Sequence, residues 1–247
     1  MGQTTRWPFD RPSVLALTEA RQKSLVRFIN DLAQTHTVSS VVDVGCGIGD
    51  FTRLLCERGL KVMGIDGREE NVEEAKRRSP HIRFHAQNIE DPSIQNLGSF
   101  DLVVCPGLVY HLENPFQAIR NLAALTQNCL WLESMTISDG RTVALLVDEG
   151  KALDQGLNHI AFVPSVPCLI KMLSKAGFNW IYQETRLLDH KDFHSSLLYR
   201  PRRTVLVASR SELKIPGLIL KREPHSNKKN IYRFRWPSVV RFLKPRA

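Results

Sequence analysis

The stretch of sequence that decides the fold is Asp43-Val44-Gly45-Cys46-Gly47-Ile48-Gly49. A β-branched run at 39–44 leads into it and predicts a buried strand, and a helix is predicted directly after it, over 50–58. Open α/β sheets bind ligands at the carboxyl ends of their strands, at turns of this kind. Glycine suits the turn because a backbone without Cβ atoms can bend tightly and lie against a ligand.

Strands and helices alternate on both sides of this turn. The predicted strands are 39–44, 61–65, 81–85, 100–104, 129–133, 180–183 and 204–208. The predicted helices are 12–36, 50–58, 69–78, 115–125 and 165–176. Such alternation forms right-handed β-α-β units and a parallel sheet. We therefore expect the α/β class: a Rossmann-like, mostly parallel sheet of seven strands with helices on both faces.

One domain is expected over residues 1–209, with a helical lead at 1–38 and an irregular insertion on its substrate side at 135–163. Residues 210–247 are expected to form a basic tail. Charge is distributed unevenly, because residues 200–247 hold 14 Lys and Arg against two acids, about +12, although the whole chain is only +9. The rest of the chain is therefore about −3.

Aromatic residues alternate with cations in this tail, as in Tyr232-Arg233-Phe234-Arg235-Trp236. Three interpretations are open. In the first interpretation the tail binds RNA, since cations neutralise phosphates and rings stack on bases. Alternatively, residues 200–247 make peripheral contact with an anionic membrane, or the tail is a solvated extension.

The cysteine content indicates an intracellular protein. The five cysteines are odd in number and lack a C-x-x-C spacing, so we expect reduced thiols rather than a disulfide framework or a zinc ribbon. No metal site is predicted. Because the chain has no apolar run long enough to span a bilayer and no apolar signal core after Met1, we expect a cytoplasmic location, free or peripheral to the membrane.

Asp66 ends the strand that follows the glycine turn, 21 positions after Gly45. A carboxylate there can accept hydrogen bonds from both ribose hydroxyls of an adenosyl group. A dinucleotide fingerprint, G-x-G-x-x-G, would require its third glycine where Asp50 stands, and an acid at a helix N-terminus repels a pyrophosphate. S-adenosylmethionine has no phosphate, and Asp43 can meet its ammonium group, directly or through water. We therefore expect S-adenosylmethionine as the cofactor and disfavour a nicotinamide-dependent oxidoreductase.

The glycine turn resembles motif I of class I S-adenosylmethionine-dependent methyltransferases, and Gly64-Ile65-Asp66 resembles the end of their second strand. The resemblance implies a cofactor-binding set made of Asp43, Gly45, Gly47, Gly49, Asp66, Asn88 and Ile89. In this set the Asn88 side chain and the Ile89 backbone would read the adenine edge. The alternative for Asn88 is an Asx-turn that merely ends a strand.

Tyr110 and His111 follow the strand predicted at 100–104, at the same sheet edge as the glycine turn. In class I methyltransferases this segment faces the transferred methyl group, so both residues are candidates for catalysis. A histidine suits a general base because its unperturbed pKa lies near neutrality. Tyr110 would orient the acceptor or line the cofactor pocket. The alternative for His111 is a structural role under the loop.

Several short segments resemble one branch of that superfamily, over roughly residues 40–185. They are Gly107-Leu108-Val109-Tyr110-His111, Leu132-Glu133-Ser134, Val163-Pro164-Ser165 and Ala176-Gly177-Phe178. The branch is similar to the tRNA wobble-uridine enzymes that use a carboxylated S-adenosylmethionine, but their carboxylate-binding basic residues find no match that we can place. The resemblance therefore implies the fold and the reaction rather than the acceptor.

The expected function is that of a methyltransferase (EC 2.1.1.-) acting on a small molecule, a saccharide or lipid-linked intermediate, or RNA. The alternative is a catalytically inactive methyltransferase-like module that holds RNA or an anionic membrane through its basic tail. The complete set of turn glycines with Asp43 and Asp66 favours the enzyme, because a degenerate domain often loses part of it.

Overall fold

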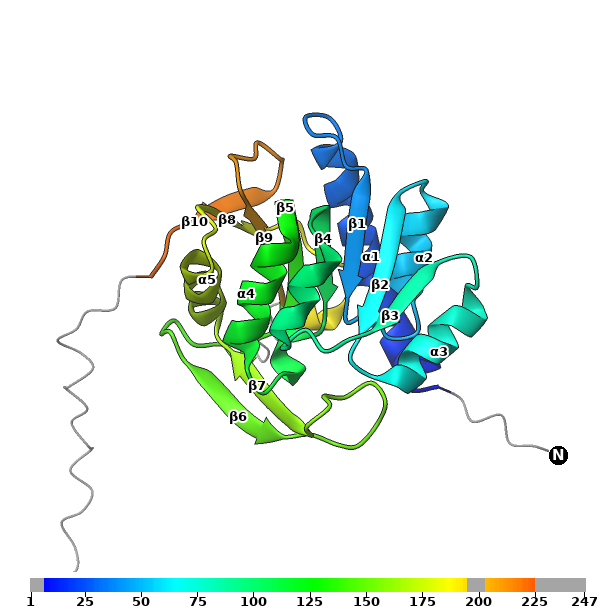
Figure 1. The fold of residues 1–247 in the computed structure, drawn as a ribbon. Helices are drawn as coiled ribbons and strands as arrows, with labels where there is room; N and C mark the ends of the chain where they lie inside the picture. Colours follow the sequence, from blue (N-terminus) through cyan, green and yellow to red (C-terminus); the bar gives the residue numbers. More distant parts are fainter. Residues whose placement is uncertain (1–6, 195–202, 225–247) are drawn as a thin grey trace, which may run out of the picture.

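The computed structural model describes residues 7–194 and 203–224 of the 247-residue chain. Its centre is a sheet in the order β10-β8-β9-β5-β4-β1-β2-β3 (Figure 1). The strands are β1 Ser40–Val44, β2 Lys61–Asp66, β3 Arg83–Ala86, β4 Phe100–Pro106, β5 Thr126–Met135, β8 Trp180–Glu184, β9 Arg203–Ser209 and β10 Leu218–Lys221. The strands β1 to β5 pair in parallel, whereas β9 is antiparallel to β5, β8 to β9 and β10 to β8. The prediction of an α/β fold with a mostly parallel sheet is confirmed.

Helices cover both faces of the sheet (Figure 1). They are α1 Pro12–Leu32, α2 Asp50–Glu57, α3 Glu69–Arg78, α4 Pro115–Leu125 and α5 Val166–Lys175. Side chains of a strand alternate between faces, and in β1 this places Val42 against the core under α4 and α5 and Val41 against the core under α1 and α2. Because the strands are buried on both faces, they are nearly continuous apolar runs in the sequence.

The sheet has eight strands, not the predicted seven, because Leu218–Lys221 adds β10 at an edge. Leu213 and Ile215, on the way to that strand, are buried in the core. The predicted domain boundary at residue 209 is therefore wrong, and the folded domain continues to Lys221. A four-residue strand after Pro216-Gly217 is too short to show a periodic pattern in the sequence. Residues 225–247 of the predicted tail lie outside the described residues.

Two of the arginines counted with the tail pack into the domain. Arg203 begins β9 and is buried, with 7% of its surface exposed. Arg210 donates hydrogen bonds to the carbonyl oxygens of Ala123 and Gly177 at 2.6 and 3.1 Å, and its guanidinium lies over the Phe178 ring. A charge count along the chain cannot separate such structural arginines from solvated ones.

The segment predicted to be irregular, 135–163, contains a two-stranded antiparallel sheet instead. Its strands are β6 Ala144–Asp148 and β7 Ile160–Pro164, joined by residues 149–159 (Figure 1). Most of β6 is exposed on both faces, so no alternation of apolar and polar residues marks it. β7 packs beside the short turn η3 Val109–His111, which follows β4. Within residues 7–194 and 203–224, no helix is long and apolar enough to cross a membrane.

Candidate active site

A cavity of about 310 Å³ opens at the carboxyl ends of β1, β2 and β4. Its walls come from the loops after these strands, from α1 and from the segment that joins β6 to β7. The predicted site residues among its lining are Gly45, Gly47, Asp66, Asn88, Ile89, Tyr110 and His111. Asp43 and Gly49 do not line the cavity. The structure thus brings seven of the nine predicted residues to one cavity.

The glycine turn has the backbone geometry that its sequence demands. Gly45, Gly47 and Gly49 have φ angles of +74°, +53° and +89°, in the region where residues with a Cβ are strained. A Cβ on Gly47 would also lie 2.9 Å from the Phe9 ring. Gly49 is the N-cap residue of α2 and packs against Phe84 rather than the cavity. Its role in this structure is to let α2 begin close to β3.

Asp43 lies beneath the turn and is completely buried. One carboxylate oxygen accepts a hydrogen bond from Thr52 Oγ1 at 2.6 Å, and the other, Oδ1, has no hydrogen-bond partner among the described residues. Burial disfavours the charged form and raises the pKa of Asp43 to about 7. A cation bound above the turn would favour the ionised form.

The raised pKa of Asp43 makes the stability of the domain depend on pH. Between about pH 4 and pH 7 the native carboxyl retains a proton that the unfolded chain releases, so the free energy of unfolding should fall as the pH rises through this window. The variant Asp43→Asn should lose this dependence. We expect the parent to lose at least about 1 kcal/mol more than the variant between pH 5 and pH 8 in urea unfolding. Parallel curves for the two proteins would contradict the prediction.

Asp66 joins the loop after β2 to the glycine turn. Its Oδ2 accepts the backbone N–H of Gly47 at 2.9 Å, and its Oδ1 accepts the N–H of Arg68 at 2.9 Å and the side-chain amide of Asn71 at 3.2 Å. Burial raises the pKa of Asp66, while these donors act in the opposite direction. Since a carboxylate accepts about four hydrogen bonds, a ligand hydroxyl can still be accommodated.

Asn88 and Ile89 follow β3 and form the next part of the wall. Asn88 Oδ1 accepts the N–H of Glu90 at 3.0 Å, which is the Asx-turn considered as an alternative. The bond occupies one acceptor position of that oxygen, so the role of Asn88 toward an adenine edge stays a prediction. Asn121 donates to the Ile89 carbonyl at 2.7 Å and holds this loop in place.

His111 is paired with a carboxylate that the sequence did not suggest. Its Nδ1 lies 2.7 and 2.8 Å from the two carboxylate oxygens of Glu149, and both side chains are nearly buried. Burial alone would raise the pKa of Glu149, but the His111 ring and the N–H of Gly156 outweigh it and lower the pKa. A histidine oriented by a carboxylate is the arrangement used in general-base catalysis.

Tyr110 belongs to a buried charged cluster at the wall of the cavity, defined by Arg21, Tyr110, Glu133 and Arg203. Arg203 donates to Tyr110 Oη and pairs with Glu133, both at 3.0 Å, and Arg21 lies 3.3 Å from the second Glu133 oxygen. The Glu133 side chain is fully buried, and the two arginines are 10% and 7% exposed. Asp192 Oδ2 also lies 3.7 Å from Arg203 Nε, so two carboxylates oppose the two guanidinium groups, and both arginines line the cavity.

Both guanidinium groups of this cluster stay charged although they are buried. Burial lowers the pKa of Arg21, with Glu133 acting against that effect. Burial also acts to lower the pKa of Arg203, but Glu133 and Tyr110 outweigh it and raise the pKa. Arginine stays charged in either case, so the cavity wall keeps both guanidinium groups charged at all working pH values.

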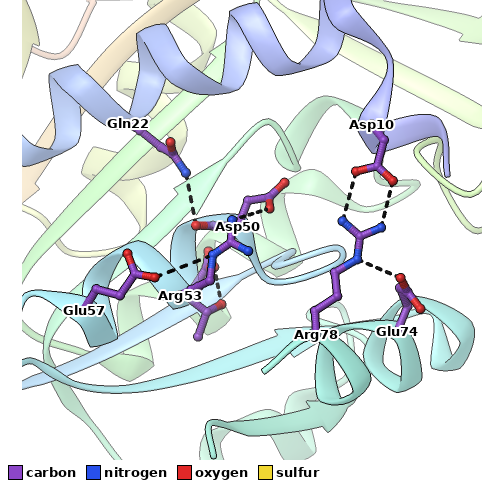
Figure 2. Close-up of polar contacts among 9 residues, drawn as sticks. Asp10, Gln22, Asp50, Arg53, Glu57, Glu74 and Arg78 are labelled. Atoms are coloured by element: carbon purple, nitrogen blue, oxygen red, sulfur yellow. Dashed lines mark hydrogen bonds and ion pairs between the residues drawn. The ribbon is translucent and has the colours of Figure 1, made fainter. Parts of the chain in front are cut away.

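The turn before α1, η1 Pro8–Asp10, is held over the glycine turn by an ionic contact (Figure 2). Arg78 at the end of α3 donates to both Asp10 oxygens at 2.9 and 2.8 Å and to Glu74 at 2.7 Å. On the other side, Gln22 of α1 donates to the Asp50 carbonyl at 3.0 Å. These contacts keep the η1 turn and α1 above the end of the cavity that the glycine turn forms.

Comparison with known proteins agrees with this geometry. Residues 41–128 match the family described as a methyltransferase domain. The N-terminal domain of EvdMO1 with SAH bound has a TM-score of 0.60 at 22% identity, and covers 78% of this chain and 80% of its own. Magnesium protoporphyrin IX methyltransferase from Synechocystis PCC 6803 with bound SAM has a TM-score of 0.55 at 20% identity, covering 85% and 86%. The chain is thus similar to methyltransferases over residues 41–128 and shares the fold of these two structures over most of its length.

Curated proteins with similar sequences fall into at least two groups. The chain is 32% identical over 148 residues to the tRNA U34 carboxymethyltransferase of Mannheimia succiniciproducens, covering 56% of this chain and 44% of the relative. It is 26% identical over 137 residues to the ubiquinone biosynthesis O-methyltransferase of Bordetella avium, covering 54% and 56%. The chain thus spans about half the length of these relatives.

Sequence reasoning missed Arg21, Glu133 as a site residue, Glu149 and Arg203. Each lies in a different element, and partners such as His111 and Glu149 are 38 positions apart. No local motif marks them, since a buried ion pair is specified only when the fold brings its members together. The one available signal was Glu133, an acid inside an otherwise apolar predicted strand, which needs a buried partner.

Proposed function

We propose that this protein is an S-adenosylmethionine-dependent methyltransferase. The observation that carries the proposal is the position of Asp66, which lines the cavity while it accepts the N–H of Gly47. This contact holds a ribose-binding carboxylate and a glycine turn at one end of a cavity. Asp50, the first residue of α2, also lines the cavity and would repel a pyrophosphate, which disfavours a dinucleotide.

The residues present fit an adenosyl cofactor. The glycine turn offers backbone without Cβ atoms, Asp66 offers acceptor capacity for the ribose, and Asn88 with Ile89 would lie at the base. The unpartnered Oδ1 of Asp43 beneath the turn suits a cationic ligand, reached through the turn or through water. The bound cofactor would supply a methyl group activated on a sulfonium.

The chain would then position and deprotonate the acceptor. Tyr110 and His111 lie at the end of β4, beside the glycine turn, where an acceptor would meet the methyl group. Because Glu149 engages His111 Nδ1, the Nε2 atom is the ring nitrogen left to take a proton from an acceptor hydroxyl or amine. This intact pair favours the enzyme over an inactive binding module.

Isothermal titration with S-adenosylmethionine, S-adenosylhomocysteine and NAD tests the cofactor. We expect binding of the first two and none of NAD. A labelled-methyl transfer screen against tRNA and small quinol or saccharide acceptors then identifies the substrate class. NAD binding as tight as that of S-adenosylmethionine would contradict the proposal.

Replacing Asp66 with alanine should weaken cofactor binding by about 10- to 150-fold, because a charged acceptor to the ribose is worth about 1.5–3 kcal/mol. Titration with S-adenosylhomocysteine measures the change, and circular dichroism confirms that the variant is folded. Asp148→Ala, which removes an exposed carboxylate from β6, is the matched control. Unchanged affinity in a folded Asp66→Ala variant would show that another residue holds the ribose.

The charged cluster favours a second candidate function, transfer of a carboxymethyl group. The relative from Mannheimia is named a tRNA U34 carboxymethyltransferase, and a group that carries a carboxylate would be matched by the guanidinium groups of Arg21 and Arg203, which line the cavity. Competition between S-adenosylmethionine and its carboxylated form decides between the candidates. If the second is right, the carboxylated form binds more tightly and Arg203→Met abolishes that preference.

RNA and an anionic membrane stay candidates for a further partner. Residues 225–247 contain seven Lys and Arg and no Asp or Glu, which supports contact with a polyanion; a tRNA-modifying relative favours RNA. Removal of residues 225–247 keeps β10 intact and should abolish binding of tRNA at low salt, while S-adenosylhomocysteine still binds. Loss of binding to anionic vesicles instead would indicate a peripheral membrane contact.

A further inference from the structure

We propose that Glu149 positions His111 as the base, and that residues 149–159 form a cover anchored at both the cofactor end and the acceptor end of the cavity. The inference rests on the proposed function, because it assigns His111 its working orientation. It adds a residue and a segment to the site that no motif in the sequence indicates.

The first step concerns the proton on His111. The lowered pKa of Glu149 keeps it ionised near neutrality, and a carboxylate can accept hydrogen bonds but not donate them. The 2.7 and 2.8 Å contacts to Nδ1 therefore place a proton on that nitrogen. The Tyr110 ring, with its centroid 4.0 Å from that of His111, packs against the imidazole and limits its rotation. Nε2 then carries the lone pair that a base requires.

The second step concerns how Glu149 itself is held. Its Oε2 accepts the N–H of Gly156 at 2.9 Å, and this hydrogen bond joins the start of the cover to its later part. A Cβ on Gly156 would collide with the carbonyl oxygen of His111, so only glycine allows the cover to lie this close to the η3 turn. Beyond it, Asn158 donates to Glu113 at 2.6 Å, which fixes the acceptor end of the cover.

The third step concerns the cofactor end. Arg68 donates to the carbonyl oxygens of Gln155 and Gly156 at 3.1 and 3.2 Å. Asn71, which is buried, donates both to the Leu153 carbonyl and to Asp66 Oδ1, each at 3.2 Å. One amide group thus bonds the ribose-binding carboxylate and the cover at the same time.

These contacts connect the two halves of the site through a single segment. Ordering of the loop after β2 holds the cover down, and the cover carries the carboxylate that orients His111. Loosening the cover at Arg68 should therefore disturb His111 even though Arg68 does not touch it.

Long-range ¹H–¹⁵N spectra of the His111 ring, recorded where imidazole is neutral, test the proposal. We expect the Nδ1–H tautomer in the parent protein and its loss in Glu149→Ala. Glu149→Gln retains an acceptor oxygen and should keep part of the preference, and it serves if the alanine variant fails to fold. Arg68→Ala should reduce the Nδ1–H population with Glu149 still in place. Asp148→Ala, an exposed neighbour, should change nothing.

Titration of the same proteins with S-adenosylhomocysteine separates this inference from the proposed function. Glu149→Ala should still bind S-adenosylhomocysteine, because Glu149 contacts neither Asp66 nor the glycine turn and Arg68 and Asn71 still hold the cover. If the parent does not bind, the proposed function fails. If the parent binds but Glu149→Ala and Glu149→Gln both show the same His111 tautomer as the parent, the positioning role is overturned. If Arg68→Ala leaves the tautomer unchanged, the connection through the cover is wrong.

Discussion

Replacing His111 with alanine should lower turnover by about 10²–10⁴, the contribution of a well-placed general base. The ring lies nearly buried at the acceptor end of the cavity, and Glu149 fixes the nitrogen that takes the proton. Affinity for S-adenosylhomocysteine should change little, because the predicted cofactor contacts come from the loops after β1, β2 and β3. Labelled-methyl transfer to the acceptor found in the screen measures the effect.

His85→Ala is the matched control for this prediction, since His85 is an exposed histidine on β3 that is not part of the cavity. It should retain the parent turnover. If His111→Ala also retains it, catalysis comes from positioning the acceptor beside the methyl group, and His111 is structural. A loss of cofactor affinity equal to the loss of turnover would assign His111 to cofactor binding instead.

Replacing Glu133 with alanine should lower the free energy of unfolding by about 3–5 kcal/mol, because it removes the ion-pair partner of buried Arg21 and leaves buried Arg203 with only the longer contact to Asp192. The Glu133 carboxylate is fully buried between Arg21 and Arg203, so water cannot replace it. Urea unfolding of the parent and the variant measures the difference. We expect this to be the largest stability loss among single substitutions of charged residues in this cluster.

Two further variants separate charge from packing at this position. Glu133→Gln keeps the shape but removes the charge, and it should lose most of the same stability. Combining Glu133→Ala with Arg21→Met should recover part of it, because one unpaired cation is then removed. A loss below about 1 kcal/mol in Glu133→Ala would show that water or an anion enters the cluster, which would itself support an anion site at this wall.

The cofactor end of the site could be predicted from sequence because its signals are local. Three glycines in one turn and an acid at the end of the next strand are each specified by a short stretch, and the parallel sheet brings them together. Asp43, beneath the turn, was found by the same motif. Its burial and its raised pKa were not, since they depend on how Thr52 and the neighbouring strands pack.

The acceptor end could not be predicted in the same way. His111 was found from its place after a strand, but Glu149 comes from a loop that reaches it only through the pairing of β6 with β7. Arg203 looked like part of a basic run, because a charge count does not record which side chains the sheet buries. The strand β10 was not predicted because four residues are too few to show a periodic pattern of apolar and polar residues.

The place of β9 in the sheet has a consequence for how the molecule is made. β9 lies between β5 and β8, although both of those strands precede it along the chain. A nascent chain that ends before residue 203 therefore holds two unpaired strand edges, which are prone to aggregate until the last strand enters. Arg203 arrives with that strand, so the charged cluster at the wall of the cavity is completed in the same event that closes the sheet. Newly synthesised protein should acquire activity only after β9 has inserted, and any factor that shields the open edges would govern its yield.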